Sequence, residues 1–188
     1  MTSAPTAFAA MRPSHLPAAL ALALVVAACG GGGPSVPASV MAPALAPVGE
    51  GDRLYYDNSG GIADSVRIVV RSVDELTDVW GRATSRQSAP PPVPAVDFAS
   101  RMVVVVGAGR LTPEDQIRVD SVGIRTVTDA AGVDEDVLAV VVRTITGCGR
   151  FQVDAYPVEI VTVPRFGGDV RFVERTSSDP NCGPLATR

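Results

Sequence analysis

From residue 53 onward, short apolar runs alternate with polar, glycine-rich and proline-rich segments, a pattern typical of β-strands and turns. The strands that this pattern predicts are Arg53–Asp57, Ser65–Arg71, Met102–Val106, Ile117–Val127, Val137–Ile145, Val158–Val163 and Val170–Glu174. The turn-rich segments "TDAAGVDED" and "PRFGGD" each separate two of these runs and predict β-hairpins. Met102–Val106 is apolar at every position, which predicts a central strand buried on both faces.

The segment "SVDELTDVWGRA" is the one convincing helical pattern in the chain. Ser72 and Glu75 have the spacing of an N-terminal capping box. The apolar residues that follow share one helical face: Val73, Leu76, Val79, Trp80 and Ala83. We therefore expect Trp80, the only tryptophan, in the core rather than at a ligand. Hairpins with one main amphipathic helix, without repeated strand–helix alternation, predict a single small α+β domain with a mostly antiparallel β-sheet.

The stretch "VVVVGAG", Val103–Gly109, has the look of a dinucleotide-binding turn. Such a turn needs a third glycine where this chain has Thr112, and a helix that opens directly after it. Pro113 and a strand-like run follow instead, so no crossover helix is available for parallel pairing. We therefore expect Gly107 and Gly109 to end a core strand and let the chain turn.

Residues 1–28 predict a signal peptide. Leu16–Ala28 is apolar but shorter than the roughly 20 residues of a spanning helix, and Arg12 alone carries charge before it. The run ends in Val26-Ala27-Ala28-Cys29, which resembles the lipobox of bacterial lipoproteins. The resemblance implies cleavage before Cys29 and acylation of its thiol; an ordinary secretory cleavage or a chance free cysteine are the alternatives. Since Gly30 stands where inner-membrane retention usually shows Asp, we expect a lipid-anchored protein of the cell envelope, at an outer membrane where there are two, facing the periplasm or the surface.

A glycine- and proline-rich segment separates the predicted anchor from the predicted domain. Residues 29–51 contain the lipidated cysteine and a stretch without periodicity, which predicts a tether. Residues 52–188 are enough for one domain with an ordinary core. The segment "SRQSAPPPVPAV" within the domain has two interpretations, a stiff surface connector or a recognition site for aromatic grooves, and the connector is the commoner case.

Two cysteines, Cys148 and Cys182, remain in the predicted domain. An even pair in an exported protein favours a disulfide over two free thiols. The bond would close a loop of 33 intervening residues and stabilise the fold by roughly 3–4 kcal/mol. It would also hold the irregular tail "TSSDPNCGPLATR".

The composition removes most catalytic chemistry. The chain has no lysine, and its only histidine, His15, lies in the predicted signal peptide, which excludes histidine triads, histidine metal sites, Schiff bases and the P-loop lysine. Removal of residues 1–28 takes away one of 16 basic residues and none of 20 acidic ones, so a nucleic-acid partner is not expected. The acidic segment Asp129 to Asp136 lacks calcium-loop spacing and predicts a solvated hairpin loop. We expect no metal, no cofactor and no catalytic residue.

Residues from about Ile68 to Glu174 resemble the C-terminal domain of PrcB, a lipoprotein subunit of a surface protease complex, and the wider set of PrcB-like lipoproteins. The matching positions, in order, are Trp80, Asp97, Phe98, Gly107, Tyr156, Pro157 and Pro164. Asp97 is expected to cap the turn into the following strand, and Phe98 to pack beneath it. The resemblance implies that the chain binds and stabilises a partner protein, such as a protease, and transfers no catalytic residue. The segment "AGRLTPEDQ" replaces the family's Thr-Gly-Gly-Tyr-like loop. If that loop contacts the partner in the family, the choice of partner is in doubt for this chain.

Two hypotheses of different classes follow. The first is a lipid-anchored extracytoplasmic domain that binds a protein and stabilises a surface or envelope protease complex. The alternative is a carboxylate-based enzyme or binding protein for envelope glycans, which needs two carboxylates converging in one cleft. A third possibility is a purely structural envelope lipoprotein, which the sequence alone does not distinguish from the first hypothesis.

Overall fold

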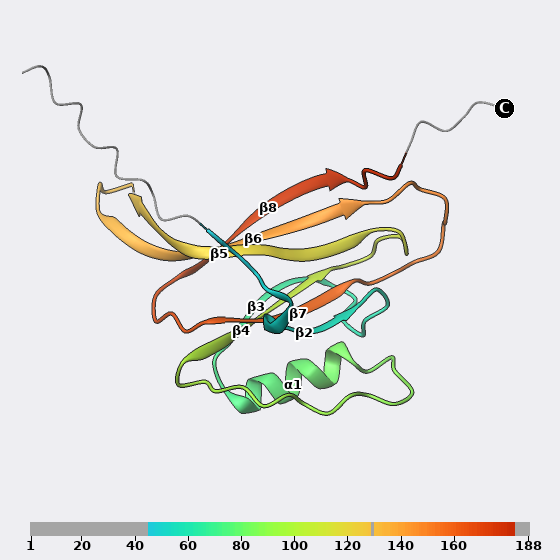
Figure 1. The fold of residues 1–188 in the computed structure, drawn as a ribbon, viewed down its shortest axis with the longest axis horizontal. Coiled ribbons are helices and arrows are strands. Elements are labelled where there is room, and N and C mark those ends of the chain that lie inside the picture. The colour runs from blue at the N-terminus through green and yellow to red at the C-terminus, as the bar shows by residue number, and fades with distance from the viewer. Residues whose placement is uncertain (1–44, 129, 183–188) are drawn as a thin grey trace, which may run out of the picture. The chain divides into compact units, whose positions relative to one another are not determined.

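A computed structural model describes residues 45–128 and 130–182 of the chain (Figure 1). Its elements are β1 (Ala46–Pro47), the 3-10 helix η1 (Glu50–Asp52), β2 (Arg53–Asp57), β3 (Ser65–Val70), α1 (Val73–Ala83), β4 (Arg101–Ala108), β5 (Gln116–Thr128), β6 (Asp134–Thr146), β7 (Val158–Pro164) and β8 (Val170–Ser178). In this part of the chain the strands form two four-stranded sheets, accompanied by one α-helix. The predicted α+β fold with a single main helix is confirmed.

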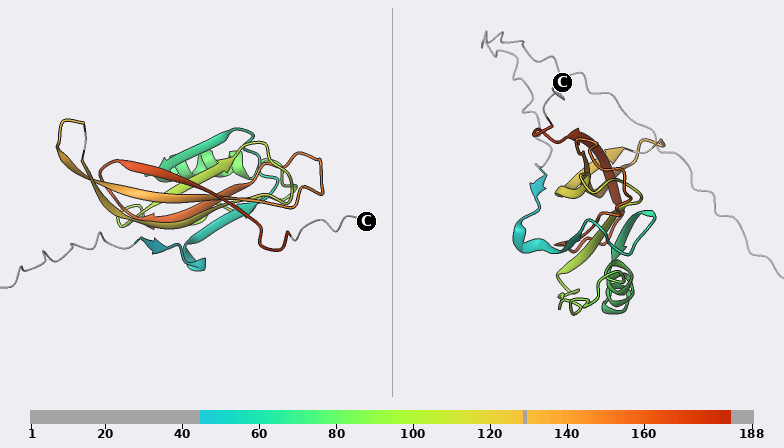
Figure 2. Two further views of the ribbon diagram at one scale, coloured as in Figure 1. Left: turned by 90° about the horizontal axis from the view of Figure 1, so that it is seen from above. Right: turned by 90° about the vertical axis from the view of Figure 1, so that its right-hand side faces the viewer.

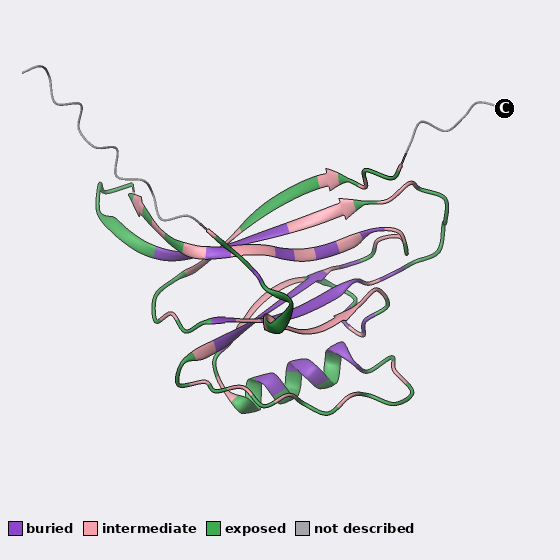
Figure 3. Cartoon of the chain, viewed as in Figure 1, coloured by how far each residue is buried: buried purple, intermediate pink, exposed green. Residues whose placement is uncertain are grey.

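The two sheets and the helix form three layers. The strand order is β1-β5-β6-β8 in one sheet (the outer sheet) and β2-β7-β4-β3 in the other (the central sheet). Neighbouring strands are antiparallel except β6 and β8, which run parallel. The outer sheet packs on one face of the central sheet and α1 covers the other face (Figure 2). Buried residues accordingly gather in β4, in β7 and on one side of α1 (Figure 3).

Strand β4 is buried on both faces, as its unbroken apolar run predicts. Within Met102–Val106, the even-numbered side chains face the outer sheet, the odd-numbered ones face α1, and all are fully buried. The strand ends at Ala108, and Gly109 has a φ of +75°, a left-handed conformation that favours glycine. The chain then enters the loop before β5 without forming a helix, so the predicted turn is confirmed, although β4 continues one residue past Gly107.

Helix α1 begins where the capping box predicts. Ser72 Oγ accepts a hydrogen bond from the backbone N–H of Glu75 at 3.3 Å, and the Glu75 carboxylate accepts one from the N–H of Arg71 at 2.7 Å. The buried residues of the helix are Leu76, Val79, Trp80 and Ala83. The prediction was wrong for Val73, whose side chain is 60% exposed. At 3.6 residues per turn, Val73 lies roughly 70° from the centre of the buried stripe.

Trp80 lies in the core, as predicted, and also holds the proline-rich loop. Its ring packs against Tyr55 at 5.4 Å between centroids, and its Nε1 donates a hydrogen bond to the Pro91 carbonyl at 2.9 Å. Gln87, at the start of the loop, donates to the Tyr55 hydroxyl at 2.8 Å and to Asp57 at 3.0 Å. Burial, followed by the hydrogen bond to Asp57, raises the pKa of Tyr55. These bonds favour the connector interpretation of the loop.

The two predicted hairpins have different outcomes. Strands β5 and β6 pair from Gln116 to Thr128 as an antiparallel hairpin, as predicted. The hairpin predicted from "PRFGGD" is wrong, because β8 pairs with β6 in the outer sheet and not with β7. Both edges of β7 are already occupied by β2 and β4. The connecting segment crosses between the sheets instead, and Phe166 packs against their shared core.

The domain begins earlier than the predicted boundary at residue 52. Ala46 and Pro47 pair with β5, and Val48 is buried between the sheets with its backbone N–H bonded to the Asp120 carbonyl at 2.9 Å. The end of the expected tether, residues 46–51, therefore belongs to the fold, because Val48 gains a buried site that its proline-rich context did not reveal. The predicted signal peptide and Cys29 lie outside the described residues. Within residues 45–128 and 130–182, no helix has the length and apolarity to cross a bilayer.

Candidate functional site

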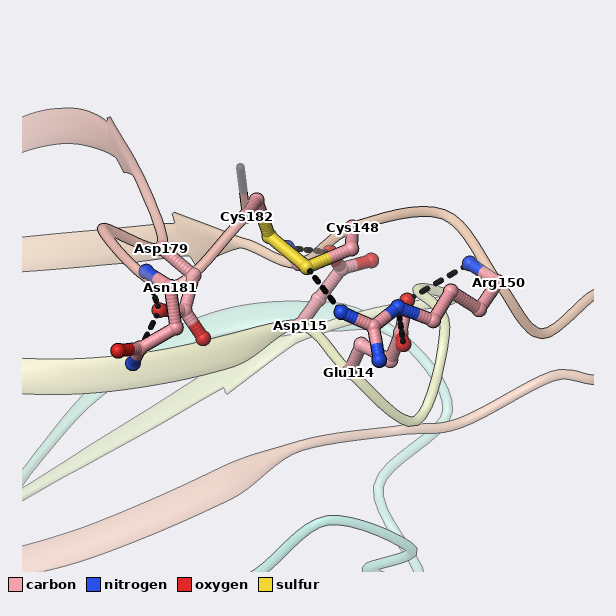
Figure 4. The surroundings of a disulfide bond; sticks show 8 residues. Glu114, Asp115, Cys148, Arg150, Asp179, Asn181 and Cys182 are labelled. Atoms are coloured by element: carbon pink, nitrogen blue, oxygen red, sulfur yellow. Dashed lines mark hydrogen bonds and ion pairs between the residues drawn. A yellow bond between two sulfur atoms is a disulfide. The ribbon is translucent and has the colours of Figure 1, made fainter. Parts of the chain in front are cut away.

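A disulfide joins Cys148 and Cys182, as predicted (Figure 4). Cys148 follows β6 and Cys182 follows β8, which are parallel neighbours, so the bond connects the same ends of both strands. A backbone hydrogen bond from Asp179 to Thr146, at 2.8 Å, adds a second link. In the described part of the chain, β8 has only β6 as a neighbouring strand, and these two links hold its C-terminal end in place.

Two loops far apart in sequence meet beside this disulfide. Leu111, in the loop between β4 and β5, exchanges two backbone hydrogen bonds with Ala155, both at 2.9 Å. Ala155 lies in the connection between β6 and β7. The surface formed by residues 109–116, 147–157 and 179–182 is called the loop end from here on. It contains residues 109–116 of "AGRLTPEDQ", the segment in which the sequence departs from the PrcB-like pattern.

The carboxylate of Asp115 connects two loops of the loop end through hydrogen bonds. It is buried and accepts hydrogen bonds from the backbone N–H and hydroxyl of Thr112, both at 2.9 Å, and from the N–H of Gly147 at 2.8 Å. Burial alone would raise the pKa of Asp115, but the bonds from the Thr112 and Gly147 N–H groups and the Thr112 hydroxyl outweigh it and lower the pKa. The ionised carboxylate thus connects the two loops.

The chain also needs glycine at one point of this contact. A Cβ atom at Gly147 would lie 2.2 Å from the Cβ of Glu114, closer than packed atoms approach. Glu114 in turn accepts a hydrogen bond from the backbone N–H of Arg150 at 2.8 Å (Figure 4). Glu114 therefore contacts the chain on both sides of Cys148.

Two large apolar side chains of the loop end are exposed to solvent. Phe151 is 57% exposed and Val153 is 60% exposed. They line an open groove of about 630 Å³, together with Leu111 and the ion pair of Arg110 with Asp154, whose Nε and Oδ1 atoms are 2.8 Å apart. Exposed apolar side chains ringed by polar groups are characteristic of surfaces that bind other proteins.

The positions that carry the family resemblance are mostly structural. Asp97 caps the turn before β4: it accepts hydrogen bonds from Ser100 Oγ at 2.6 Å and from the Ala99 N–H at 3.0 Å, and these bonds lower its pKa. Phe98 is half-buried against the core beneath α1. Both roles match the expectation. Gly107 lies within β4, where a Cβ atom would come within 2.9 Å of the Val66 side chain.

The remaining family positions lie around the start and end of β7. Tyr156 donates its backbone N–H to the Asn58 carbonyl at 3.0 Å, and its ring lies 4.4 Å from the guanidinium carbon of Arg86. The Pro157 carbonyl accepts a hydrogen bond from β4, and Pro164 ends β7. Of the seven positions, only Tyr156 and Pro157 belong to the loop end, so the family pattern does not by itself mark this surface.

Sequence reasoning missed a buried carboxylate, Glu159 of β7. Its side chain is fully buried between the sheets and accepts hydrogen bonds from the Val119 N–H at 2.5 Å, from Arg118 at 3.1 Å and from Arg53. Val119 lies beside a β-bulge in β5, where the register with β6 shifts. The local signal was a single charge in the apolar run "VEIVTV", but its partners come from β2 and β5.

Arg118 also contacts an aromatic ring. Its guanidinium carbon lies 3.7 Å from the centroid of Tyr56. Burial raises the pKa of the Tyr56 hydroxyl, while the charge of Arg118 opposes that shift and the charge of Glu159 adds to it. Glu159, its arginines and Tyr56 thus form one network that joins β2 and β7 to β5. This network connects the two sheets.

The remaining acidic residues do not form a site. In the described residues, no three potential metal ligands lie close enough together to hold an ion. Asp134 and Asp136 belong to β6 and bond to hydroxyls of β5, while Asp129 lies outside the described residues. Asp64 and Asp78 line an open groove of about 630 Å³ along α1, but both are exposed and neither side chain forms a hydrogen bond in the described part of the chain. The hypothesis of a glycan-directed enzyme or binding protein stays a prediction.

Comparison with protein-family models, curated protein sequences and solved structures finds no match to this chain. The resemblance to PrcB-like lipoproteins stays a prediction.

Proposed function

We propose that this protein is a lipid-anchored extracytoplasmic interaction domain that binds a partner protein through the loop end. The observation that carries the proposal is the pair of protruding side chains, Phe151 and Val153, on loops fixed by a disulfide and by Asp115. The lipobox, the tether and the absence of histidine and lysine from the predicted mature chain support the same role. The PrcB-like resemblance suggests a protease as the partner.

The rigidity of the loop end supports binding because ordering a flexible loop costs free energy at association. Here the disulfide and the Leu111–Ala155 bonds already hold the loops together. Phe151 would enter an apolar site of the partner, and the Arg110–Asp154 pair would form a polar rim. Truncating an anchor of this kind weakens binding by about 2 kcal/mol or more, which is about 30-fold.

The test is affinity purification of the full-length chain, tagged at the C-terminus and expressed at its native level. Complexes are extracted in mild detergent, cross-linked and identified by mass spectrometry. The test variant is Phe151→Ser with Val153→Ser, and the matched control is Val73→Ser with Val93→Ser, since all four side chains are exposed.

We expect the native chain and the control variant each to recover one partner protein in a ratio near one-to-one. By the resemblance, this partner is a protease. The test variant should not recover it. A solitary monomer, or equal recovery of every partner by both variants, would contradict the proposal.

A further inference from the structure

The two edges of the outer sheet differ. At the β5 edge, β1 pairs with Ser121 and Val122, and Val48 extends the contact with a hydrogen bond to the Asp120 carbonyl. On the opposite edge, β8 pairs only with β6, and no other strand of the described residues lies beside it. Strand β8 extends over nine residues, so a row of backbone N–H and C=O groups is directed outward.

Strand β8 is held firmly in spite of its position at the edge. Arg67 of β3 forms two hydrogen bonds with the Glu174 carboxylate, at 2.7 and 2.9 Å, which connect β8 to the central sheet. Phe172 packs into the core between the sheets. The disulfide after Ser178 fixes the C-terminal end. The open edge is therefore a preformed template for another strand.

The side chains on the outward face of β8 carry unneutralised charge. Because side chains alternate along a strand and Phe172 and Glu174 face the central sheet, Arg171, Val173 and Arg175 face away from it. All three are exposed, and neither arginine forms an ion pair in the described part of the chain.

An arginine of the neighbouring strand β6 lies beside this charge. In the register of β6 and β8, Arg175 lies directly opposite Arg143. Like charges in this position are unfavourable. Arg143 is neutralised by Asp120, at 2.7 Å between Nη2 and Oδ1, whereas Arg175 is left without a counter-charge in the described residues. The open edge thus combines unpaired backbone groups with a local excess of positive charge.

The arginines decide which strand fits this edge. A second copy of β8, paired antiparallel about Val173, would bring Arg171 of each copy opposite Arg175 of the other. Such pairs repel, so the charges disfavour self-association and favour a strand with carboxylates in those positions.

We propose that β8 binds an extended acidic segment of a partner protein as an added edge strand. The backbone of the bound segment would complete the outward hydrogen bonds of β8. Two carboxylates of the segment, each two positions from its central residue, would lie beside Arg171 and Arg175. The central residue would be apolar and would contact Val173. This surface is separate from Phe151, so the inference does not rest on the function proposed for the loop end.

The test uses the full chain with its disulfide intact and a fluorescein-labelled peptide, TETVTET, followed by fluorescence anisotropy. The comparison peptides are TKTVTKT, which reverses the charge, and TETVTET with alternate backbone nitrogens methylated, which blocks one hydrogen-bonding edge. The protein variant is Arg171→Glu with Arg175→Glu, and a control with the same change in charge is Arg82→Glu in α1 with Arg125→Glu in β5, both outside β8 and the loop end.

We expect TETVTET to bind the native chain and the control variant, and to lose about tenfold or more in affinity with the β8 variant. TKTVTKT should show the reverse preference, and methylation should weaken binding to the native chain. Hydrogen exchange should show new protection at outward N–H groups of β8 when TETVTET is bound.

Three results would overturn the inference. They are equal binding of both charge types, equal loss of affinity in both protein variants, and binding that methylation does not change. Binding to anionic vesicles that requires Arg171 and Arg175, without binding of TETVTET, would also overturn it and assign the arginines to a membrane surface instead.

Discussion

The central sheet and the outer sheet are built from similar apolar strands, but their surroundings differ. The central sheet is covered by α1 on one face and by the outer sheet on the other, and the five residues Met102–Val106 of β4 have no exposed surface. The outer sheet has one covered face, one open edge at β8, and a disulfide where β6 and β8 end. Stability therefore resides mainly in the central sheet, whereas the candidate binding surfaces lie on the outer sheet and its loops.

The two sheets also differ in how far their paired glutamates are exposed to solvent. Glu159 of the central sheet is fully buried with two arginines, whereas Glu174 of the outer sheet is half exposed and pairs with Arg67. Removing Glu159 would leave two poorly solvated charges between the sheets, while removing Glu174 would leave a charge that water can reach. The two glutamates should therefore contribute very different amounts to the free energy of unfolding.

The largest expected effect follows from this pair. Glu159→Ala should lower the free energy of unfolding by about 3–5 kcal/mol, and Glu174→Ala by about 0–1 kcal/mol. Urea unfolding of both variants, followed by circular dichroism, measures the difference. Similar losses for the two variants would show that the buried network does not join the sheets as described.

Loss of the disulfide should have the second largest effect on the free energy of unfolding. With Cys148→Ser and Cys182→Ser together, the free energy of unfolding should fall by about 3–4 kcal/mol, given the sequence separation of 34 residues. Native-state hydrogen exchange should show faster opening of β8 than of β4, because the lost link holds only the edge of the outer sheet. An unchanged exchange rate in β8 would show that the strand does not need the link.

Asp115 gives a pH-dependent prediction. Its pKa is lower in the folded chain than its ordinary value of 3.8, so its contribution to stability is present above that value and is lost as pH falls through the lower, folded pKa. Asp115→Asn should lower the free energy of unfolding at pH 7 by roughly 1.5–3 kcal/mol, the range for a hydrogen bond to a charged group.

The variant should also lose less stability than the native chain when pH falls from about 5 to about 2. Unfolding curves across this range, with Asp64→Asn as an exposed control, provide the measurement. Parallel pH profiles for the native chain and Asp115→Asn would contradict the assignment.

The smallest effect is expected at the open edge. Val173→Ala should change the free energy of unfolding by less than about 0.5 kcal/mol, because the side chain has no covering layer. Met102→Ala, fully buried in β4, should cost about 2–5 kcal/mol. Thermal unfolding of the two variants compares them, and a large loss at Val173 would mean that the edge is part of the core.

Local patterns were sufficient for much of this fold. The capping box and apolar stripe predicted α1, the unbroken apolar run predicted β4, and turn residues predicted the β5–β6 hairpin. Each of these depends on residues close together in the sequence. The pair Cys148 and Cys182 was predictable for another reason, since an even number of cysteines in an exported domain favours a bond.

Apart from Val73 at the margin of the buried stripe of α1, the errors concern contacts between segments that are distant in the sequence. Adjacency of β7 and β8 in sequence suggested a hairpin, but β7 had no free edge. Val48 looked like part of a tether because its buried site is made by β5 and the central sheet. Glu159 looked isolated because its partners come from β2 and β5. The loop end combines three distant segments, so its position could not be read from any one of them.

The most direct test of the loop end as a binding surface is site-specific photo-crosslinking in cells. The photoreactive residue p-benzoylphenylalanine is placed at Phe151, and separately at the exposed Val73 of α1, in the full chain at its native level. The account predicts that position 151 yields one dominant crosslinked protein and that position 73 does not yield it. The same products at both positions, or none at 151, would contradict it.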